Sequence, residues 1–165
     1  MSISREVLAK YIRRDHTVFV ECGSRWGDTL IRAIEAGAFQ ARGCESDGLY
    51  AAAGEAHVKE LCPLGNATIY PISSVLLLAS EPTCKGKDIV VFLDAHTETH
   101  SPVLDELAII SKWEEKPRAI IIDDMQLMKG WGIRVEDLYL KLQEMGYICH
   151  REDGVVCEDI LVAQR

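Results

Sequence analysis

The sequence predicts a doubly wound α/β fold, in which seven strands form a mostly parallel sheet between two layers of helices. Short apolar stretches recur along the 165 residues and alternate with amphipathic stretches. Most of the apolar stretches are continuous, which is typical of strands buried on both faces of a parallel sheet. Right-handed connections between such strands place helices on both faces. The composition is that of a globular protein, with 48% hydrophobic and 27% charged residues, and we expect a single domain over residues 1–165.

The strands are predicted where the apolar stretches lie. These stretches cover residues 17–22, 41–45, 67–71, 88–94, 118–123, 147–150 and 155–163. The first six strands are expected to alternate with helices. The turn signal Glu152-Asp153-Gly154 separates the last two strands and predicts a hairpin at the end of the chain.

Helix signals lie between the predicted strands. Asp28 can cap a helix whose apolar residues recur on one face. Residues 48–61 are rich in alanine and favour a helix. Ser101-Pro102 predicts a further helix start, with Ser101 as the cap and Pro102 in the first helical position. Residues 135–145 show the apolar spacing of the last helix.

Charge and hydropathy limit the possible partners. The chain has 18 Lys and Arg against 26 Asp and Glu, a net charge of −8, which argues against broad binding of nucleic acid. No apolar run approaches the roughly 18 residues that cross a bilayer. The N-terminus has no hydrophobic signal core, so we expect a cytoplasmic protein with no membrane partner. The six cysteines form no C-x-x-C pair and are expected to be reduced thiols.

The turn after the first predicted strand has the character of a ligand-binding loop. Gly23 and Gly27 let the backbone turn sharply and approach a ligand closely. The helix that follows offers free N–H groups at its N-terminus. Arg25 stands where the dinucleotide fingerprint G-x-G-x-x-G has its second glycine, and Arg25 and Trp26 would obstruct a pyrophosphate. NAD and FAD are therefore disfavoured.

An acidic residue ends the second predicted strand. Glu45 lies 22 residues after Gly23, and a carboxylate at this position can accept both hydroxyls of a ribose. A solvated loop carboxylate is the plain alternative. The glycine turn and the acidic residue together favour a nucleoside-containing cofactor more than either does alone.

Residues 18–29 and 43–47 resemble the class I S-adenosylmethionine-dependent methyltransferases. The resemblance covers the whole order of seven strands. It implies a Rossmann-like sheet with strand order 3-2-1-4-5-7-6, the last strand antiparallel, and S-adenosylmethionine as the cofactor. The cofactor-binding residues that it implies are Glu21, Gly23, Ser24, Arg25, Trp26, Gly27, Glu45, Ser73, Ser74 and Asp94.

The resemblance also assigns parts of the cofactor to parts of the chain. It places the methionine part on the first loop and the ribose on Glu45. Ser73 and Ser74 follow the third strand, where the family often has an acidic or amide residue near the adenine. This departure leaves the contact with the adenine open.

Carboxylates gather at the ends of the fourth and fifth predicted strands. Asp94 ends one strand and the pair Asp123-Asp124 ends the other. Neighbouring strands lie about 4.8 Å apart, so the three side chains are expected to meet. Three carboxylates so close repel one another unless a proton or a cation neutralises them. A divalent ion such as Mg²⁺ fits such a site, although acidic residues at strand ends also serve as helix caps and turn residues.

The same residues resemble the metal-dependent O-methyltransferases, including those that act on sugars. Such an ion would bind a hydroxyl of a small-molecule or sugar acceptor and lower its pKa, and Asp94 or His96 is placed to take the proton. The subgroup commonly has Asp-x-Asp where this chain has Asp94-Ala95-His96. The histidine favours Mn²⁺, Fe²⁺ or Zn²⁺ as alternatives to Mg²⁺.

Two other functions stay open at this point. The chain is short for this fold, so it could be a module that binds the cofactor or a partner without catalysis, or an oligomer that borrows a lid. A metal-dependent phosphohydrolase is disfavoured, because His96 and Glu98 stand where that chemistry needs Asp and Thr. Residues 129–132 predict either a mobile flap over the site or a plain loop.

Overall fold

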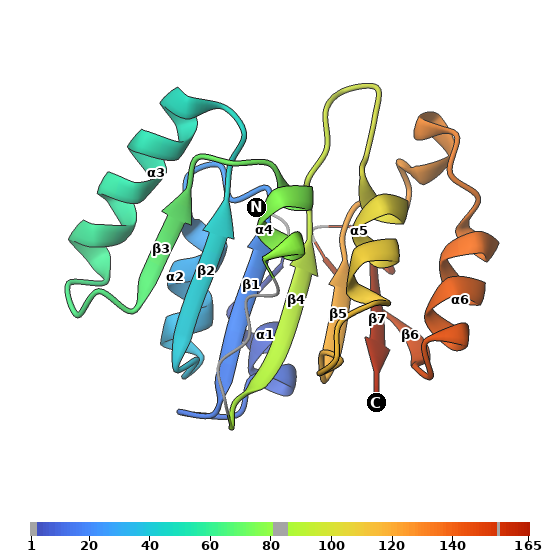
Figure 1. The fold of residues 1–165 in the computed structure, drawn as a ribbon, viewed down its shortest axis with the longest axis horizontal. Coiled ribbons are helices and arrows are strands. Elements are labelled where there is room, and N and C mark those ends of the chain that lie inside the picture. The colour runs from blue at the N-terminus through green and yellow to red at the C-terminus, as the bar shows by residue number, and fades with distance from the viewer. Residues whose placement is uncertain (1–2, 81–85, 155) are drawn as a thin grey trace.

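The computed structural model describes residues 3–80, 86–154 and 156–165. These residues form a seven-stranded sheet with the order β3-β2-β1-β4-β5-β7-β6 (Figure 1). The strands are β1 (Thr17–Cys22), β2 (Gln40–Cys44), β3 (Ala67–Tyr70), β4 (Asp88–Leu93), β5 (Ala119–Ile122), β6 (Ile148–Glu152) and β7 (Ile160–Gln164). β7 runs antiparallel to both of its neighbours, and β1 to β5 are parallel. The predicted fold class and strand order are confirmed.

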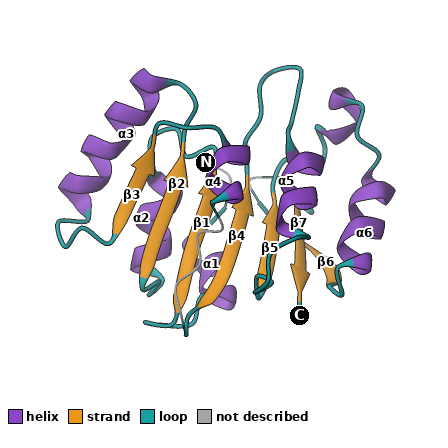
Figure 2. Cartoon of the chain, in the orientation of Figure 1, coloured by secondary structure: helices purple, strands orange, loops and turns teal. Residues whose placement is uncertain are grey.

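Helices cover both faces of the sheet (Figure 2). They are α1 (Arg5–Tyr11), α2 (Asp28–Glu35), α3 (Gly48–Leu61), α4 (Ser74–Ala79), α5 (Val103–Ile110) and α6 (Val135–Glu144), with a 3₁₀ helix η1 (Met128–Trp131). Buried residues of α1, α2 and α3 pack in one core, and those of α4, α5 and α6 pack in the other. Each face of the central strands therefore has its own hydrophobic core, which explains their continuous apolar sequences.

The register of the parallel strands brings their carboxyl ends to one level. Cys22 of β1 pairs with Cys44 of β2 and with Leu93 of β4, and Leu93 pairs with Ile122 of β5. The next residue of each strand is the one at which it leaves the sheet. These four residues are Gly23, Glu45, Asp94 and Asp123. The register of the strands therefore brings these four residues to the same edge of the sheet.

Several predicted boundaries are wrong by a few residues. The cap of α2 is Gly27, not Asp28, because Gly27 takes the left-handed conformation (φ 79°) and Asp28 is already helical. The cap of α5 is Pro102, and the helix starts one residue later than predicted. The hydroxyl of Ser101 still accepts from the backbone N–H of Val103 at 3.4 Å, so it assists that start from outside the helix.

The final hairpin is also shorter than predicted. β7 begins at Ile160 rather than at residue 155, which lies outside the described residues. Residues 156–159 form a loop, in which Glu158 has a positive φ of 56° that does not continue a strand. The helix α1 was not predicted, and α4 was expected from the alternation of strands and helices but its residues were not located, since the two helices have only seven and six residues and carry little periodicity.

No helix among the described residues is long and apolar enough to cross a membrane. The five cysteines that the structure describes are free thiols, in agreement with the expectation from the sequence. Cys84 lies outside the described residues.

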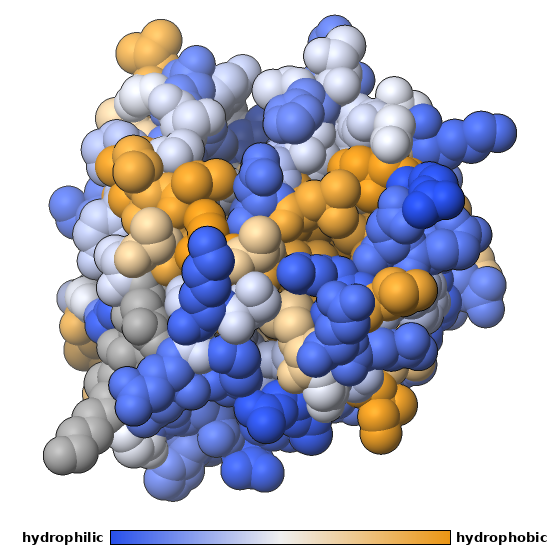
Figure 3. Space-filling model, turned by 45° about the vertical axis from the view of Figure 1, so that its right-hand side comes forward, coloured by the Kyte–Doolittle hydropathy of each residue, from blue (hydrophilic) through white to orange (hydrophobic). Residues whose placement is uncertain are grey.

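Hydrophobic residues lie at the surface across the middle of one side of the molecule, between hydrophilic residues above and below (Figure 3). Large exposed apolar side chains include Leu76 of α4 and Leu104 of α5.

Candidate functional site

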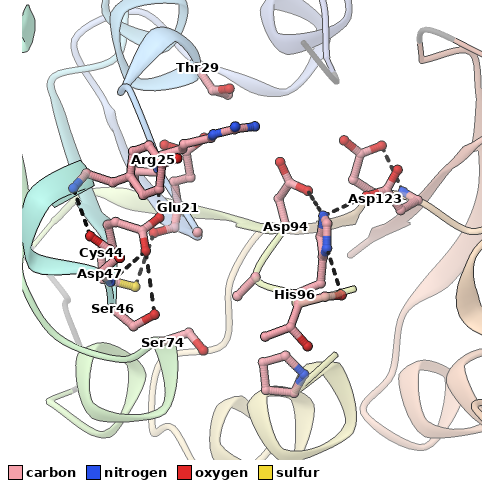
Figure 4. Close-up of a pocket in the computed structure, with 18 of the residues that line it drawn as sticks. Glu21, Arg25, Thr29, Cys44, Ser46, Asp47, Ser74, Asp94, His96 and Asp123 are labelled. Atoms are coloured by element: carbon pink, nitrogen blue, oxygen red, sulfur yellow. Dashed lines mark hydrogen bonds and ion pairs between the residues drawn. The ribbon is translucent and has the colours of Figure 1, made fainter. Parts of the chain in front are cut away.

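A cleft of about 1070 Å³ opens at the carboxyl ends of the parallel strands. Its walls come from the loops after β1 to β5 and from the residues just before β7 (Figure 4). Ligands of open α/β sheets bind at this edge. All the site residues predicted from the sequence line the cleft, apart from Gly27.

Gly23 makes the sharp exit from β1 possible. Its φ of +87° is in the left-handed region, and a Cβ there would lie 2.7 Å from the carbonyl oxygen of Asp94. The backbone N–H groups of Gly23 and Ser24 donate to the carbonyl oxygen of Cys44 at 3.1 and 2.8 Å. The first loop is therefore pressed between the ends of β2 and β4, and no larger residue fits at Gly23.

Gly27 has a packing role. A Cβ at this position would lie 2.4 Å from a methyl carbon of Val58 and 2.9 Å from one of Ile69. The glycine thus lets the start of α2 lie directly against α3 and β3. Gly27 holds the first loop in place from outside the cleft.

Two polar side chains of the first loop are buried at the cleft wall. Glu21 and Ser24 are 1% and 5% exposed, and both line the cleft. Among the described residues, Oε2 of Glu21 and Oγ of Ser24 have no hydrogen-bond partner of good geometry. Burial raises the pKa of Glu21 to about 7, and nearby Ser24 and Thr29 partly oppose this. Such groups are expected to be satisfied by a bound ligand.

Glu45 organises the loop that follows β2. Its carboxylate accepts the backbone N–H of Arg25 at 3.2 Å and that of Asp47 at 2.9 Å. Arg25 has a positive φ of 45°, so the carboxylate helps to hold a strained turn. The Trp26 ring meets the ring of Tyr50 edge-on at 5.4 Å, and together they form the outer rim beside Glu45.

Ser73 and Ser74 form the start of α4. The hydroxyl of Ser73 accepts the backbone N–H of Leu76 at 3.4 Å and caps this helix. Ser74 is almost completely buried, and its side chain lines the cleft (Figure 4). Ser73 is therefore partly used by the helix, whereas Ser74 faces the space that a ligand would fill.

The other half of the cleft contains a compact group of side chains of the types that can bind a metal ion. Nε2 of His96 lies 3.1 Å from Oδ2 of Asp124 and 3.9 Å from Oδ1 of Asp94. Asp123 falls into a second group with Asp124 and Asp159. One oxygen of Asp123 accepts the backbone N–H of Asp124 at 2.9 Å and so supports the turn in which Asp124 has a positive φ of 54°.

The electrostatics of this group reflect unbalanced negative charge. Burial, then the charge of Asp123, then those of Glu21 and Asp124, raise the pKa of Asp94 to about 8. The pKa of His96 is also raised, chiefly by its hydrogen bond to Asp124. Both shifts mean that protons are held where a cation would compete for the same atoms.

The hydrogen bonding of His96 tests whether the group fits a metal ion. Nδ1 lies 3.3 Å from the carbonyl oxygen of Thr97, which only accepts, so Nδ1 carries a proton. Nε2 then faces the carboxylates of Asp94 and Asp124 and needs either a proton or a cation. A metal-binding histidine commonly donates its other N–H to a backbone carbonyl in this way. Two ligands at about 2.1 Å from one ion lie about 3 Å apart, which the distance between His96 and Asp124 matches.

The structure adds Asp159, which the sequence did not single out, to the site, and it brings Trp131 of the candidate flap 129–132 onto His96. Asp159 precedes β7, and its two carboxylate oxygens accept the backbone and side-chain N–H groups of Gln126 at 3.0 and 3.1 Å. Trp131 of η1 stacks on His96, with 5.0 Å between ring centroids. Sequence reasoning counted Asp159 within a predicted strand. Only the tertiary fold places Asp159 beside the site.

The sheet has the architecture of the class I S-adenosylmethionine-dependent methyltransferases, and the chain shares their fold. A precorrin-6y C5,15-methyltransferase from Geobacter metallireducens superposes with a TM-score of 0.66 and 12% identity, over 98% of this chain and 87% of that one. A Klebsiella pneumoniae protein assigned provisionally as an O-methyltransferase gives 0.69 and 16%, over 97% and 78%.

A magnesium protoporphyrin IX methyltransferase from Synechocystis, solved with S-adenosylmethionine bound, gives a TM-score of 0.65 at 17% identity, over 97% of this chain and 76% of that one. No family model and no curated protein sequence matches the chain. At these identities the likeness shows the fold, and the chemistry has to be argued from the site itself.

Proposed function

We propose that this protein is an S-adenosylmethionine-dependent methyltransferase that uses a divalent metal ion to methylate a hydroxyl of a small molecule or sugar. The observation that carries the proposal is the position of Nε2 of His96 between Asp94 and Asp124. This group borders a cleft whose other wall holds Glu21 and Ser24, each with a buried oxygen that has no hydrogen-bond partner of good geometry among the described residues. The cleft lies at the ligand-binding edge of a class I methyltransferase fold.

The first half of the cleft would bind the cofactor. Glu21 and Ser24 offer buried polar atoms for the methionine part. Burial raises the pKa of Glu21, so a positive charge nearby would stabilise its carboxylate form. Glu45 would accept the ribose hydroxyls at the end of β2. Ser73 and Ser74 would border the adenine. Arg25 and Trp26 would form the outer wall of this half.

Asp94, His96 and Asp124 would hold the metal ion. Their donor atoms lie within 4.8 Å of one another, and the mixture of imidazole and carboxylate suits Mn²⁺, Fe²⁺ or Zn²⁺ as well as Mg²⁺. The backbone bond accepted by Asp123 and its grouping with Asp159 favour a supporting role for this residue, beside Asp124. The spacing thus favours His96 over Asp123 as the third ligand.

When bound, S-adenosylmethionine would supply a transferable methyl group. The metal ion would supply a positive charge that favours the ionised form of an acceptor hydroxyl. The protein would supply alignment. The first loop and Asp94 are in backbone contact, so the cofactor half and the metal half of the cleft are held at a fixed separation. Asp94 lies at their boundary and is placed to take the proton of the hydroxyl.

The charge of the cleft supports an acceptor other than nucleic acid. The described lining residues include nine Asp and Glu but only two Arg and no Lys. Phosphate groups of a nucleic acid would be repelled by such walls. A neutral or cationic compound with a hydroxyl group would not be repelled by them.

Calorimetric titration of the purified protein with S-adenosylmethionine tests this function, with MnCl₂ or MgCl₂ and again with EDTA. We expect micromolar binding and a different enthalpy or affinity in EDTA. A screen of hydroxyl acceptors for methyl transfer follows. Binding without turnover of any acceptor would favour a non-catalytic binding module. No binding in either buffer would contradict the methyltransferase proposal.

A further inference from the structure

A buried carboxyl group lies close to the cleft but outside the residues that line it. Glu106 belongs to the first turn of α5 and is completely buried. Among the described residues, neither of its carboxyl oxygens has a hydrogen-bond partner of good geometry. Buried polar groups are almost always hydrogen-bonded in folded proteins, so this side chain requires an explanation.

Two buried polar side chains lie beside Glu106. They are the hydroxyl of Ser74 in α4 and the thiol of Cys22 in β1, and both are close enough to lower the pKa of the carboxyl group. The helices α4 and α5 pack against each other, and Ser74 is the first residue of α4. Ser74 also lines the cleft (Figure 4). Ser74 therefore connects Glu106 with the space that a ligand would fill.

The surroundings of Glu106 favour its neutral form. Burial raises the pKa of Glu106 to about 7, Ser74 and Cys22 oppose this, and the charge of Asp105 on the same helix adds to it. No Lys, Arg or His is among these described groups. A neutral carboxyl group has one O–H donor, which a carboxylate lacks. That donor can satisfy the Ser74 oxygen and leave the Ser74 hydrogen for a ligand.

We propose that Glu106 is a positioning residue for the cofactor, and that its buried carboxyl group acts through Ser74 to orient the Ser74 hydroxyl toward the adenosine end of the cleft. With the cofactor bound, the carboxyl O–H would donate to Oγ of Ser74, and the Ser74 O–H would then point to an acceptor atom of the adenosine. This inference rests on the proposed function, because it takes the ligand of the cleft to be S-adenosylmethionine.

A double-mutant cycle on the full chain tests this coupling. The affinity for S-adenosylhomocysteine is measured by calorimetry for the wild type, Glu106→Met, Ser74→Ala and the double variant. Each single variant is expected to bind about five- to tenfold more weakly, the effect of one hydrogen bond. The double variant should bind no more weakly than either single variant, since both remove the same oriented hydroxyl.

Two control variants separate positioning from a general effect on the fold. Glu106→Gln keeps a donor and an acceptor at the same place, so its affinity should stay within about twofold of the wild type. Ser24→Ala removes a buried hydroxyl at the opposite end of the cleft. Combined with Glu106→Met, its effect should be additive. Urea denaturation shows that each variant is folded.

The outcomes are distinct. Unchanged affinity in Glu106→Met, or additive losses with Ser74→Ala, would overturn the inference while leaving the proposed function standing. If the wild type binds neither S-adenosylmethionine nor S-adenosylhomocysteine, the proposed function falls, and the inference with it. Should Glu106→Met not fold, Glu106→Asn, which withdraws the polar group by one methylene, replaces it in the same cycle.

Discussion

His96 is held in one orientation by three neighbours of different kinds. Nδ1 donates to the carbonyl oxygen of Thr97, Nε2 faces Asp124, and the ring stacks on Trp131. A proton on Nε2 and a metal ion satisfy the same carboxylates, so they compete for one position. At the residue scale the site is therefore arranged before any ligand arrives, which limits the reorganisation that binding requires.

Asp124→Asn is expected to abolish the response of the protein to a divalent ion. An amide is a weaker ligand than a carboxylate and removes one negative charge from the group. At a metal concentration of about 100 times Kd, the wild type should gain about 2.7 kcal/mol, seen as a rise of several degrees in Tm. The control is Glu98→Gln, an exposed carboxyl of the same cleft outside the group, which should keep the response. An unchanged rise in Asp124→Asn would show that Asp124 is structural.

Glu45→Ala is expected to weaken binding of S-adenosylmethionine more than tenfold, because the variant loses a charged acceptor for the ribose hydroxyls. Calorimetry gives the affinity. Glu45 also accepts the backbone N–H groups of Arg25 and Asp47, so part of the loss could come from the loop. Glu45→Gln keeps one acceptor oxygen for these bonds and should fall between the wild type and Glu45→Ala. Equal affinity in all three proteins would remove Glu45 from the site.

At the scale of elements, the site depends on how closely the first loop packs on the strand beside it. Ser24 lies over Gly43 of β2, where a Cβ would come within 2.0 Å of the Ser24 hydroxyl oxygen and 2.8 Å of a methyl carbon of Leu30. The missing side chain of Gly43 is thus what leaves room for the buried hydroxyl at the cleft wall.

Gly43→Ala should therefore destabilise the protein by about 1–3 kcal/mol, the usual cost of overpacking. It should also weaken binding of S-adenosylmethionine, because Ser24 has to move. Urea denaturation and calorimetry measure the two effects. Gly48→Ala is the matched control, since a Cβ there has no atom within 4 Å and alanine favours the helix that starts at this residue. Equal behaviour of the two variants would contradict this view of the loop.

The elements also show what the sequence could predict. The central strands were predicted because both of their faces are buried, which leaves a continuous apolar sequence. Their carboxyl ends follow from the parallel order, so the meeting of Asp94 with Asp124 was predictable as well. A helix was expected between the third and fourth strands, but the residues of α4 were not located, because six residues show almost no periodicity.

The parts of the site that were missed depend on contacts between distant segments. Asp159 reaches the group only through the antiparallel return of β7 beside β5. The sequence places Glu106 in the first turn of a helix, but only the packing of α5 on α4 shows that it is buried. The packing role of Gly27 likewise comes from side chains of α3 and β3. Local patterns contain no information about such neighbours.

On the scale of the whole molecule, the protein has a net charge of −8 and yet buries carboxyl groups in its interior. Glu21 and Glu106 both have a pKa raised from 4.5 to about 7. Each group gives up its proton more readily in the unfolded chain than in the folded one. The folded state is therefore favoured below the unfolded pKa and loses that advantage as the pH rises through the folded pKa.

The free energy of unfolding is accordingly expected to fall between about pH 4.5 and pH 7, by up to about 3 kcal/mol for each group. Urea denaturation at pH 5, 6, 7 and 8 in EDTA measures this change. Glu106→Gln has no proton to lose, so its stability should fall less over the same range. A stability that rises from pH 5 to pH 8 would show that these carboxyl groups are solvated or paired.

The stacking of Trp131 on His96 has a practical consequence. A protonated imidazole accepts an electron from an excited indole and quenches its emission, whereas an uncharged ring does so weakly. Trp113 is buried with its Nε1 donating to the carbonyl oxygen of Leu78, and Trp26 lies against Tyr50, so their environments are separate. When a closed-shell ion such as Mg²⁺ or Zn²⁺ displaces the proton from His96, Trp131 should brighten. Trp131 is thus an intrinsic fluorophore with which occupancy of the proposed metal site can be tested without any substrate or dye.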